Sequence, residues 1–158
     1  MGRPRCCRAA KNVKFIFVGD GPLRPHLTEL IRSKKLEDHV QLLGLRLDVA
    51  DILHAIDIFC LASHYEGMGR VILEAQAAGK PVVARAVGGI NNITQNNKTA
   101  ILISQDCDLS SGLSKLISDS HLRAQMGREA FQFVDARFTA DKMIRDIGKL
   151  YESFLKNG

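Results

Sequence analysis

Short apolar runs alternate with longer amphipathic stretches between residues 13 and 104. Five runs have the length and continuous apolar character of buried strands, and they span residues 13–19, 40–44, 57–63, 81–86 and 99–104. Stretches with apolar residues at helical spacing separate the first four runs. Continuous apolar strands joined by helices predict a parallel sheet covered on both faces. We therefore expect an α/β fold with a Rossmann-like, doubly wound parallel sheet.

The pattern changes after residue 104. Three stretches, 108–120, 121–138 and 139–155, have helical spacing and no strand between them, which predicts a helical C-terminal tail. The last stretch carries an apolar stripe at helical spacing, made of Ile144, Ile147, Leu150, Tyr151 and Phe154. One interpretation is that this stripe packs onto the sheet of the same domain, and an alternative is given below.

The charge of the chain argues against a nucleic-acid partner. The 158 residues carry a formal net charge of +5, which comes from 22 basic and 17 acidic residues. Four of the basic residues fall in the first eleven positions: Arg3, Arg5, Arg8 and Lys11. The rest of the chain is nearly neutral and offers no basic helix with interleaved aromatic residues. We expect no nucleic acid to bind.

The first residues do not resemble a folded segment. Residues 1–12 are expected to form a disordered arm or the edge of an expression fragment, and residues 13–158 a single folded domain. The arm has no apolar centre of the kind that a secretory signal has. Neither the adjacent Cys6 and Cys7 nor the isolated Cys60 and Cys107 have disulfide or zinc spacing. Idle thiols in a reducing compartment predict a cytoplasmic protein, and no metal site is expected.

Four loops follow the predicted strands at the edge where ligands of parallel sheets bind. They are "GDGP" (19–22), "GLRLD" (44–48), "SHYEGMG" (63–69) and "RAVGGINN" (85–92). Glycines let the backbone approach a ligand closely, although they also serve tight turns. "GMG" directly precedes a helix, whose free N–H groups and positive dipole end favour an anion such as a diphosphate.

Two carboxylates, Glu66 and Glu74, stand eight positions apart around that helix start. A rise of about 1.5 Å per residue puts them about 10 Å apart, which is wide for two acids that act on one glycosidic bond. The spacing suits two hydroxyl-bearing parts of one extended ligand with phosphates between them, as in a nucleotide sugar. The alternative is that Glu74 is a solvated helix residue.

These motifs resemble a known family. Residues 13–155, and above all "HYEGMGRVILEAQAAGKPVVARAVGG", look like the C-terminal domain of GT-B-fold retaining glycosyltransferases of group 1, family four. The resemblance implies that Glu66 is the catalytic residue and binds hydroxyls of the donor sugar, while Glu74 holds the ribose hydroxyls. The implied donor-binding positions also include Gly19, Gly21, Arg46, Gly67, Met68 and Gly69.

The resemblance also implies what the chain needs and lacks. Enzymes of this type use a nucleotide diphosphate sugar as donor, with no metal, no cofactor and no clear protein nucleophile. The arm does not match the family segment whose Arg and Lys clamp the diphosphate. The N-terminal, acceptor-binding domain is expected to be absent, which makes the chain a hexosyltransferase half that is inactive alone. The acceptor would be a glycan or a lipid-linked molecule of polysaccharide biosynthesis, with peripheral membrane association of the full-length enzyme.

Some alternatives stay open at this point. The chain can instead be a non-catalytic domain that binds a nucleotide or sugar phosphate, or a partner-binding module. His64 can act as a base or be a polar loop residue. Arg85 can reach an anionic ligand from the end of its strand or be an ordinary surface charge. In the family, the last helix often packs on the acceptor domain, which is an alternative place for the apolar stripe.

Overall fold

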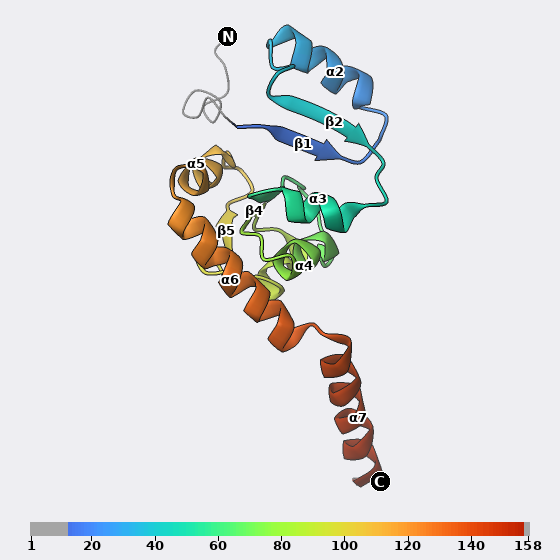
Figure 1. The fold of residues 1–158 in the computed structure, drawn as a ribbon. Helices are drawn as coiled ribbons and strands as arrows, with labels where there is room; N and C mark the ends of the chain where they lie inside the picture. Colours follow the sequence, from blue (N-terminus) through green and yellow to red (C-terminus); the bar gives the residue numbers. More distant parts are fainter. Residues whose placement is uncertain (1–12, 157–158) are drawn as a thin grey trace. The chain divides into compact units, whose positions relative to one another are not determined.

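The structure is a computed structural model that describes residues 13–156. The chain forms two compact units, the first ending at Ile52 and the second beginning at Leu53, and the short helix α3 (Val49–Ala55) spans the boundary. Figure 1 shows the order of the elements. The prediction of a separate arm at residues 1–12 lies outside the described residues.

The first unit consists of two parallel strands and one helix. β1 (Phe15–Val18) pairs with β2 (Val40–Gly44), and α2 (Arg24–Ser33) connects them. Pro25 stands in the first turn of α2, where its missing N–H leaves no helical hydrogen bond unmade. No residue of α2 is buried, and Phe17 of β1 is half exposed. This unit therefore has little core of its own among the described residues.

The second unit contains a three-stranded parallel sheet. β4 (Val82–Arg85) lies between β3 (Phe59–Leu61) and β5 (Ala100–Ile103). Three of the four β4 residues are fully buried, as expected for a central strand covered on both faces. Within the described residues the five predicted strands thus form two parallel sheets, one in each unit, rather than one continuous sheet.

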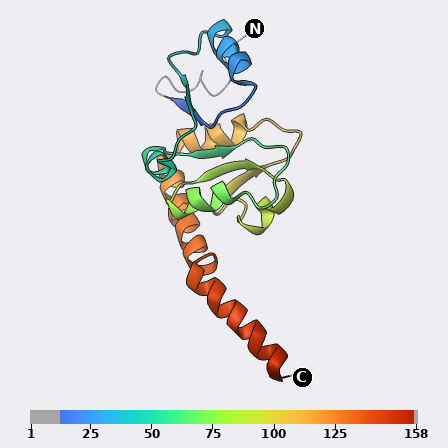
Figure 2. The ribbon, with the colours of Figure 1, turned by 90° about the vertical axis from the view of Figure 1, so that its right-hand side faces the viewer.

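Helices cover the second sheet on both faces. Figure 2 shows α4 (Arg70–Ala77) on one side of the strands and α5 (Ser110–Ser118) on the other. α6 (Ser120–Arg137) packs against both α4 and α5. On the α5 side, the main apolar cluster consists of Val83, Ile101, Leu109, Leu116 and Met126. The α/β, Rossmann-like architecture with a helical tail is confirmed.

Two glycines allow α6 to approach the end of α4. A Cβ added to Gly127 of α6 would lie 2.2 Å from the carbonyl oxygen of Gly79, much closer than any real Cβ contact. Gly79 itself ends the α4 segment with a φ of 68°, a left-handed conformation that favours glycine. Gly79 thus marks the C-terminal end of α4.

The last helix, α7 (Ala140–Lys156), contradicts one expectation. Its apolar stripe does not pack on the sheet of its own unit. The side chains of Ile144, Ile147, Leu150, Tyr151 and Phe154 are all exposed, as are Met143 and Leu155. Figures 1 and 2 show α7 extending beyond α6 and away from the sheet. Of the two alternatives, packing on the sheet of the same domain is therefore excluded, because helical spacing identifies the apolar face of a helix but not what covers it.

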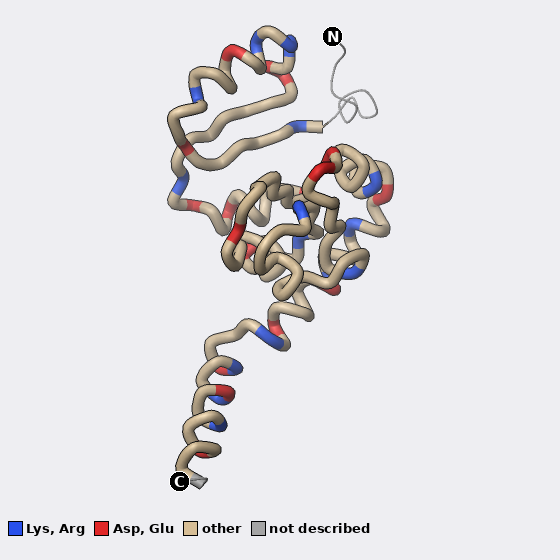
Figure 3. Tube along the Cα trace, turned by 180° about the vertical axis from the view of Figure 1, so that it is seen from behind, with Lys and Arg blue, Asp and Glu red and all other residues tan. Residues whose placement is uncertain are grey.

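Charged residues of both signs are interspersed along the described chain, including α7 (Figure 3). An ion pair between Lys142 and Asp146 joins successive turns of that helix, and it lowers the pKa of the Asp146 carboxyl. None of the helices within residues 13–156 is both long and apolar enough to cross a membrane.

Candidate functional site

A cavity of about 460 Å³ lies in the second unit, where β3, β4 and β5 reach their carboxyl ends. This is the edge at which parallel sheets bind their ligands. Glu66 and Gly67, two of the predicted site residues, line it. The other lining residues are His64, Tyr65, Ala86, Val87, Gly88 and Gln105. The loops after β3 and β4, predicted to share one rim, do meet here.

The glycine pair after β4 brings these two loops into direct backbone contact. The Gly89 N–H donates to the Gly67 carbonyl oxygen at 2.8 Å. A Cβ on Gly88 would lie 1.8 Å from the Glu66 carbonyl oxygen, and one on Gly89 would lie 2.2 Å from that of Gly67. Only glycine fits at these two positions, because the opposing atoms are backbone. The pair therefore holds the Glu66 loop against η1 (Gly88–Asn92).

The helix that follows the Glu66 loop begins without a side-chain cap. Gly69 is the N-cap residue of α4 and has a φ of 69°, and the first turn holds no acidic residue. An uncapped N-terminus leaves backbone N–H groups and the positive dipole end for an anion. Met68 is half exposed beside it. Glu74 lies further along α4, is exposed to solvent, and does not line the cavity.

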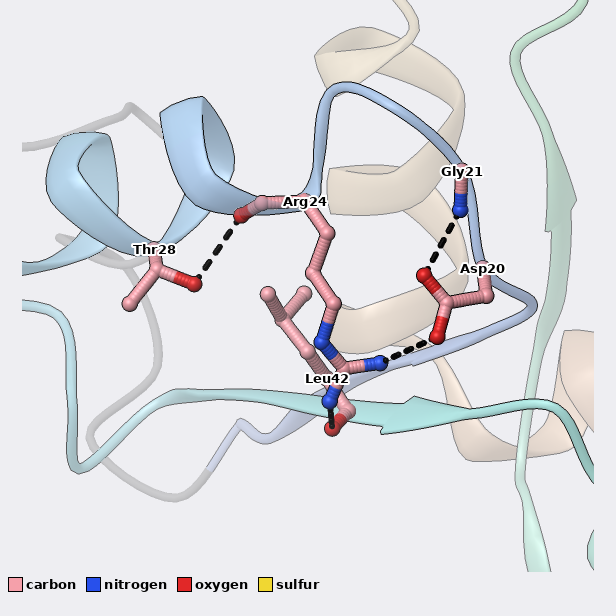
Figure 4. A network of polar contacts seen from close by, with 5 residues as sticks. All are labelled: Asp20, Gly21, Arg24, Thr28 and Leu42. Carbon is pink, nitrogen blue, oxygen red and sulfur yellow. Dashed lines mark hydrogen bonds and ion pairs between the residues drawn. The ribbon is translucent and has the colours of Figure 1, made fainter.

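The predicted residues Gly19 and Gly21 belong to the first unit, and both backbone N–H groups have protein partners. The Gly19 N–H donates to the Gly44 carbonyl oxygen at 2.8 Å. The Gly21 N–H donates to Oδ1 of Asp20 at 2.8 Å, and Arg24 donates to Oδ2 of the same carboxylate at 3.0 Å (Figure 4). This network orders the "GDGP" loop from within.

Arg46, one of the implied donor-binding positions, lies in the first unit and forms a two-pronged ion pair with Asp48. Its Nε donates to Oδ1 at 2.7 Å and an Nη donates to Oδ2. These hydrogen bonds hold the pKa of the Asp48 carboxyl below its ordinary value and raise the pKa of Arg46. Leu45 precedes Arg46 in the chain and Leu47 lies between the two paired residues. Both leucines are exposed. The loop therefore presents an apolar surface beside an arginine that is already paired.

Five cavity residues were not among the predicted site positions: Tyr65, Ala86, Val87, Gly88 and Gln105. Gln105 follows the end of β5, so the rule that ligands bind at the carboxyl ends of strands would have identified it. Tyr65 is almost fully exposed beside Glu66. His64, an undecided candidate, also lines the cavity. Among residues 13–156, no three His, Cys, Asp or Glu side chains cluster closely enough to hold a metal ion.

Comparison with known proteins matches the chain to one class of enzymes. The family model described as "Glycosyl transferases group 1" matches residues 4–133. The chain is 30% identical over 148 residues to N-acetyl-alpha-D-glucosaminyl L-malate synthase of Bacillus anthracis, a match that covers 92% of this chain and 39% of that protein. It is 32% identical to UDP-Gal:alpha-D-GlcNAc-diphosphoundecaprenol alpha-1,3-galactosyltransferase of Escherichia coli, covering 90% of this chain and 38% of that protein.

Solved structures share the fold. Anabaena HepE in complex with UDP-glucose superposes with a TM-score of 0.80 at 28% sequence identity. That match covers 91% of this chain and 42% of the HepE chain. The chain thus spans about two fifths of the length of the proteins that it matches.

Proposed function

The chain belongs to the group 1 glycosyl transferases, and from this premise we propose that it is the donor-binding part of a retaining enzyme. The donor would be a nucleotide diphosphate sugar, and the sugar would pass to a glycan or lipid-linked acceptor held by a part of the enzyme outside this chain. No metal ion or cofactor takes part in this proposal. By their names, one relative given above acts on a small acceptor and the other on a lipid-linked one, which supports a role in polysaccharide or glycoconjugate synthesis. The proposal includes a cytoplasmic enzyme that associates peripherally with a membrane.

One observation supports the proposal more than any other. Glu66 lines the cavity, and its loop leads directly into the N-terminus of α4, which has no side-chain cap. A carboxylate accepts hydrogen bonds from sugar hydroxyls, and a free helix N-terminus binds phosphate oxygens. Sugar and diphosphate are adjacent in a nucleotide sugar, as these two features are adjacent in the chain. The complexes of HepE with UDP and with UDP-glucose support uridine diphosphate as the probe to use here.

The remaining predicted residues take their roles from the same arrangement. Gly67, Met68 and Gly69 would supply backbone contacts to sugar and phosphate. Glu74 would accept hydrogen bonds from the ribose diol, and its solvent exposure leaves the carboxylate available to do so. For Gly19, Gly21 and Arg46, which belong to the first unit, the proposed roles rest on the family resemblance alone.

A titration separates the roles of the two glutamates. We expect the full chain to bind both UDP and UDP-glucose in isothermal titration calorimetry. Glu74→Gln should weaken both ligands about tenfold, because both contain the ribose. Glu66→Gln should weaken UDP-glucose by a similar factor and leave UDP unchanged, because only UDP-glucose contains the sugar. Glu152→Gln, an exposed substitution on α7, is the charge-matched control.

Two results would contradict the donor site. One is that neither nucleotide binds the wild-type chain at millimolar concentration. The other is that the Glu66 and Glu74 variants bind both ligands as well as the Glu152→Gln control does.

A second candidate function is a partner-binding module that carries out no transfer. The exposed apolar stripe of α7 favours it, since contiguous exposed apolar surface often marks an interaction site. The same titration discriminates the two, because a pure interaction module gives no selective response to Glu66→Gln.

A further inference from the structure

The guanidinium of Arg85, the last residue of β4, donates hydrogen bonds to backbone carbonyl oxygens. Its Nε donates to the Ala62 carbonyl oxygen at 3.3 Å. One Nη donates to the Gln105 carbonyl oxygen and also to that of Cys107, the latter at 3.1 Å. The sequence left open whether this side chain meets an anionic ligand or is a surface charge. Neither describes its position, because three of its five N–H donors bind protein and it does not line the cavity.

The three carbonyl partners belong to the segments that form the walls of the cavity. Ala62 lies two residues before His64 on the first wall. Ala86 and Val87, on the second wall, follow Arg85 directly in the chain. Gln105, on the third wall, is itself a carbonyl partner of Arg85. One side chain therefore joins the segments after β3, β4 and β5.

We propose that Arg85 is a positioning residue of this site, which holds the His64–Gly67 wall and the Gln105 wall at the separation that the cavity requires. That the cavity receives a nucleotide sugar rests on the proposed function. Ordering of the walls by Arg85 rests only on the contacts above.

Arginine suits this role better than lysine. Its planar fork donates in several fixed directions at once, so it can reach carbonyls on two sides. A lysine ammonium is one compact donor centre at the end of a flexible stem.

No backbone hydrogen bond joins the segment 62–63 to the segment 105–107 among those of the described residues. Arg85 is the polar link that spans them.

The test uses Arg85→Met, which keeps an unbranched apolar stem, and Arg85→Lys, which keeps the charge. Arg128→Met is the matched control, because Arg128 is an exposed residue of α6 in the same unit and its loss changes the net charge equally. Hydrogen–deuterium exchange reports on the walls without any ligand. The Ala86 amide, bonded to Ile103, and the Cys107 amide, bonded to Ser104, are the reporters. Titration with UDP-glucose reports on the site.

For Arg85→Met we expect exchange of the Ala86 and Cys107 amides to rise about tenfold and UDP-glucose to bind about tenfold more weakly, the factor that goes with losing a charge-assisted hydrogen bond. Arg85→Lys should fall between Arg85→Met and wild type in both measurements, and Arg128→Met should match wild type. If Arg85→Met fails to fold, the amide exchange and the UDP-glucose affinity of Arg85→Lys still test the proposal.

The outcomes distinguish the two proposals. Unchanged exchange in both Arg85 variants would overturn the positioning role, and so would full UDP-glucose affinity in a variant whose walls exchange faster. Wild-type affinity in Arg85→Lys with unchanged exchange would also overturn it, since that result indicates direct contact with an anion. Raised exchange in a chain whose wild type does not bind UDP-glucose would support the ordering by Arg85 and contradict the proposed function.

Discussion

Gln76 is a fully buried polar side chain in the packing of the second unit. It lies on α4 with no solvent exposure, and its Nε2 donates to the Ile93 carbonyl oxygen at 2.8 Å. Its Oε1 has no hydrogen-bond partner among the described residues. The amide thus ties α4 to the segment after η1 and leaves one buried acceptor unmatched, which costs stability.

Gln76→Glu gives a prediction with a defined pH dependence. The carboxyl would need its proton to donate to Ile93, so burial raises its folded-state pKa above the unfolded value of about 4.3. Below that pH both states are protonated and the variant is little destabilised. As pH rises above it, the unfolded state ionises first, and the free energy of unfolding should fall by about 1.4 kcal/mol per pH unit, reaching a loss of about 4 kcal/mol at pH 7.

Urea denaturation between pH 4 and 8 measures this effect against Gln132→Glu, an exposed substitution on α6. The control should stay within about 0.5 kcal/mol of wild type, as surface substitutions usually do. If Gln76→Glu followed the pH profile of the control, the side chain would not be buried as the structure has it.

At the scale of elements, the contact between α4 and α6 depends on Gly127. Gly127→Ala would push a methyl group into the Gly79 carbonyl. The two helices would have to separate, and overpacking of this kind lowers the free energy of unfolding by about 1–3 kcal/mol. Gly148→Ala on α7 is the matched control, because a Cβ there meets no atom within 4 Å. That variant should gain about 0.5–1 kcal/mol from helix propensity.

Opposite signs for the two glycine substitutions, measured as urea midpoints, are the expected result. A shift of the same sign in both would show that helix propensity, and not contact with Gly79, decides the effect at position 127.

The positions of the elements could be read from the sequence, because a strand and a helix leave different local periods. All the predicted strands and helices are present among the described residues. The apolar stripe of α7 was recognised but its surroundings were not. What packs against a helix depends on distant parts of a chain or on other chains, and a local period carries no information about them.

At the scale of the whole molecule, the matched relatives are about two and a half times as long as this chain. We predict that the purified chain alone transfers no sugar from UDP-glucose to a glycan or lipid-linked acceptor. The prediction follows from the proposal that the acceptor is held outside this chain, because transfer needs an acceptor positioned against the donor.

Release of UDP in a coupled assay checks this prediction. The expected rate is below about 1% of the median enzyme turnover of about 10 s⁻¹. Turnover in the ordinary range would contradict it and would place an acceptor site within these residues.

The sequence by itself determined the alternation of strands and helices, the family, and the two glutamates around the start of α4, since all of these are encoded in local spacing. Tertiary structure decided the rest. In the folded chain, Gln105 lines the same cavity as Glu66, and Gly88 and Gly89 contact the backbone of the Glu66 loop. Arg85 donates hydrogen bonds to three carbonyl oxygens. These features join segments 20 or more positions apart, and their meeting depends on the strand order of the sheet, which no local pattern specifies.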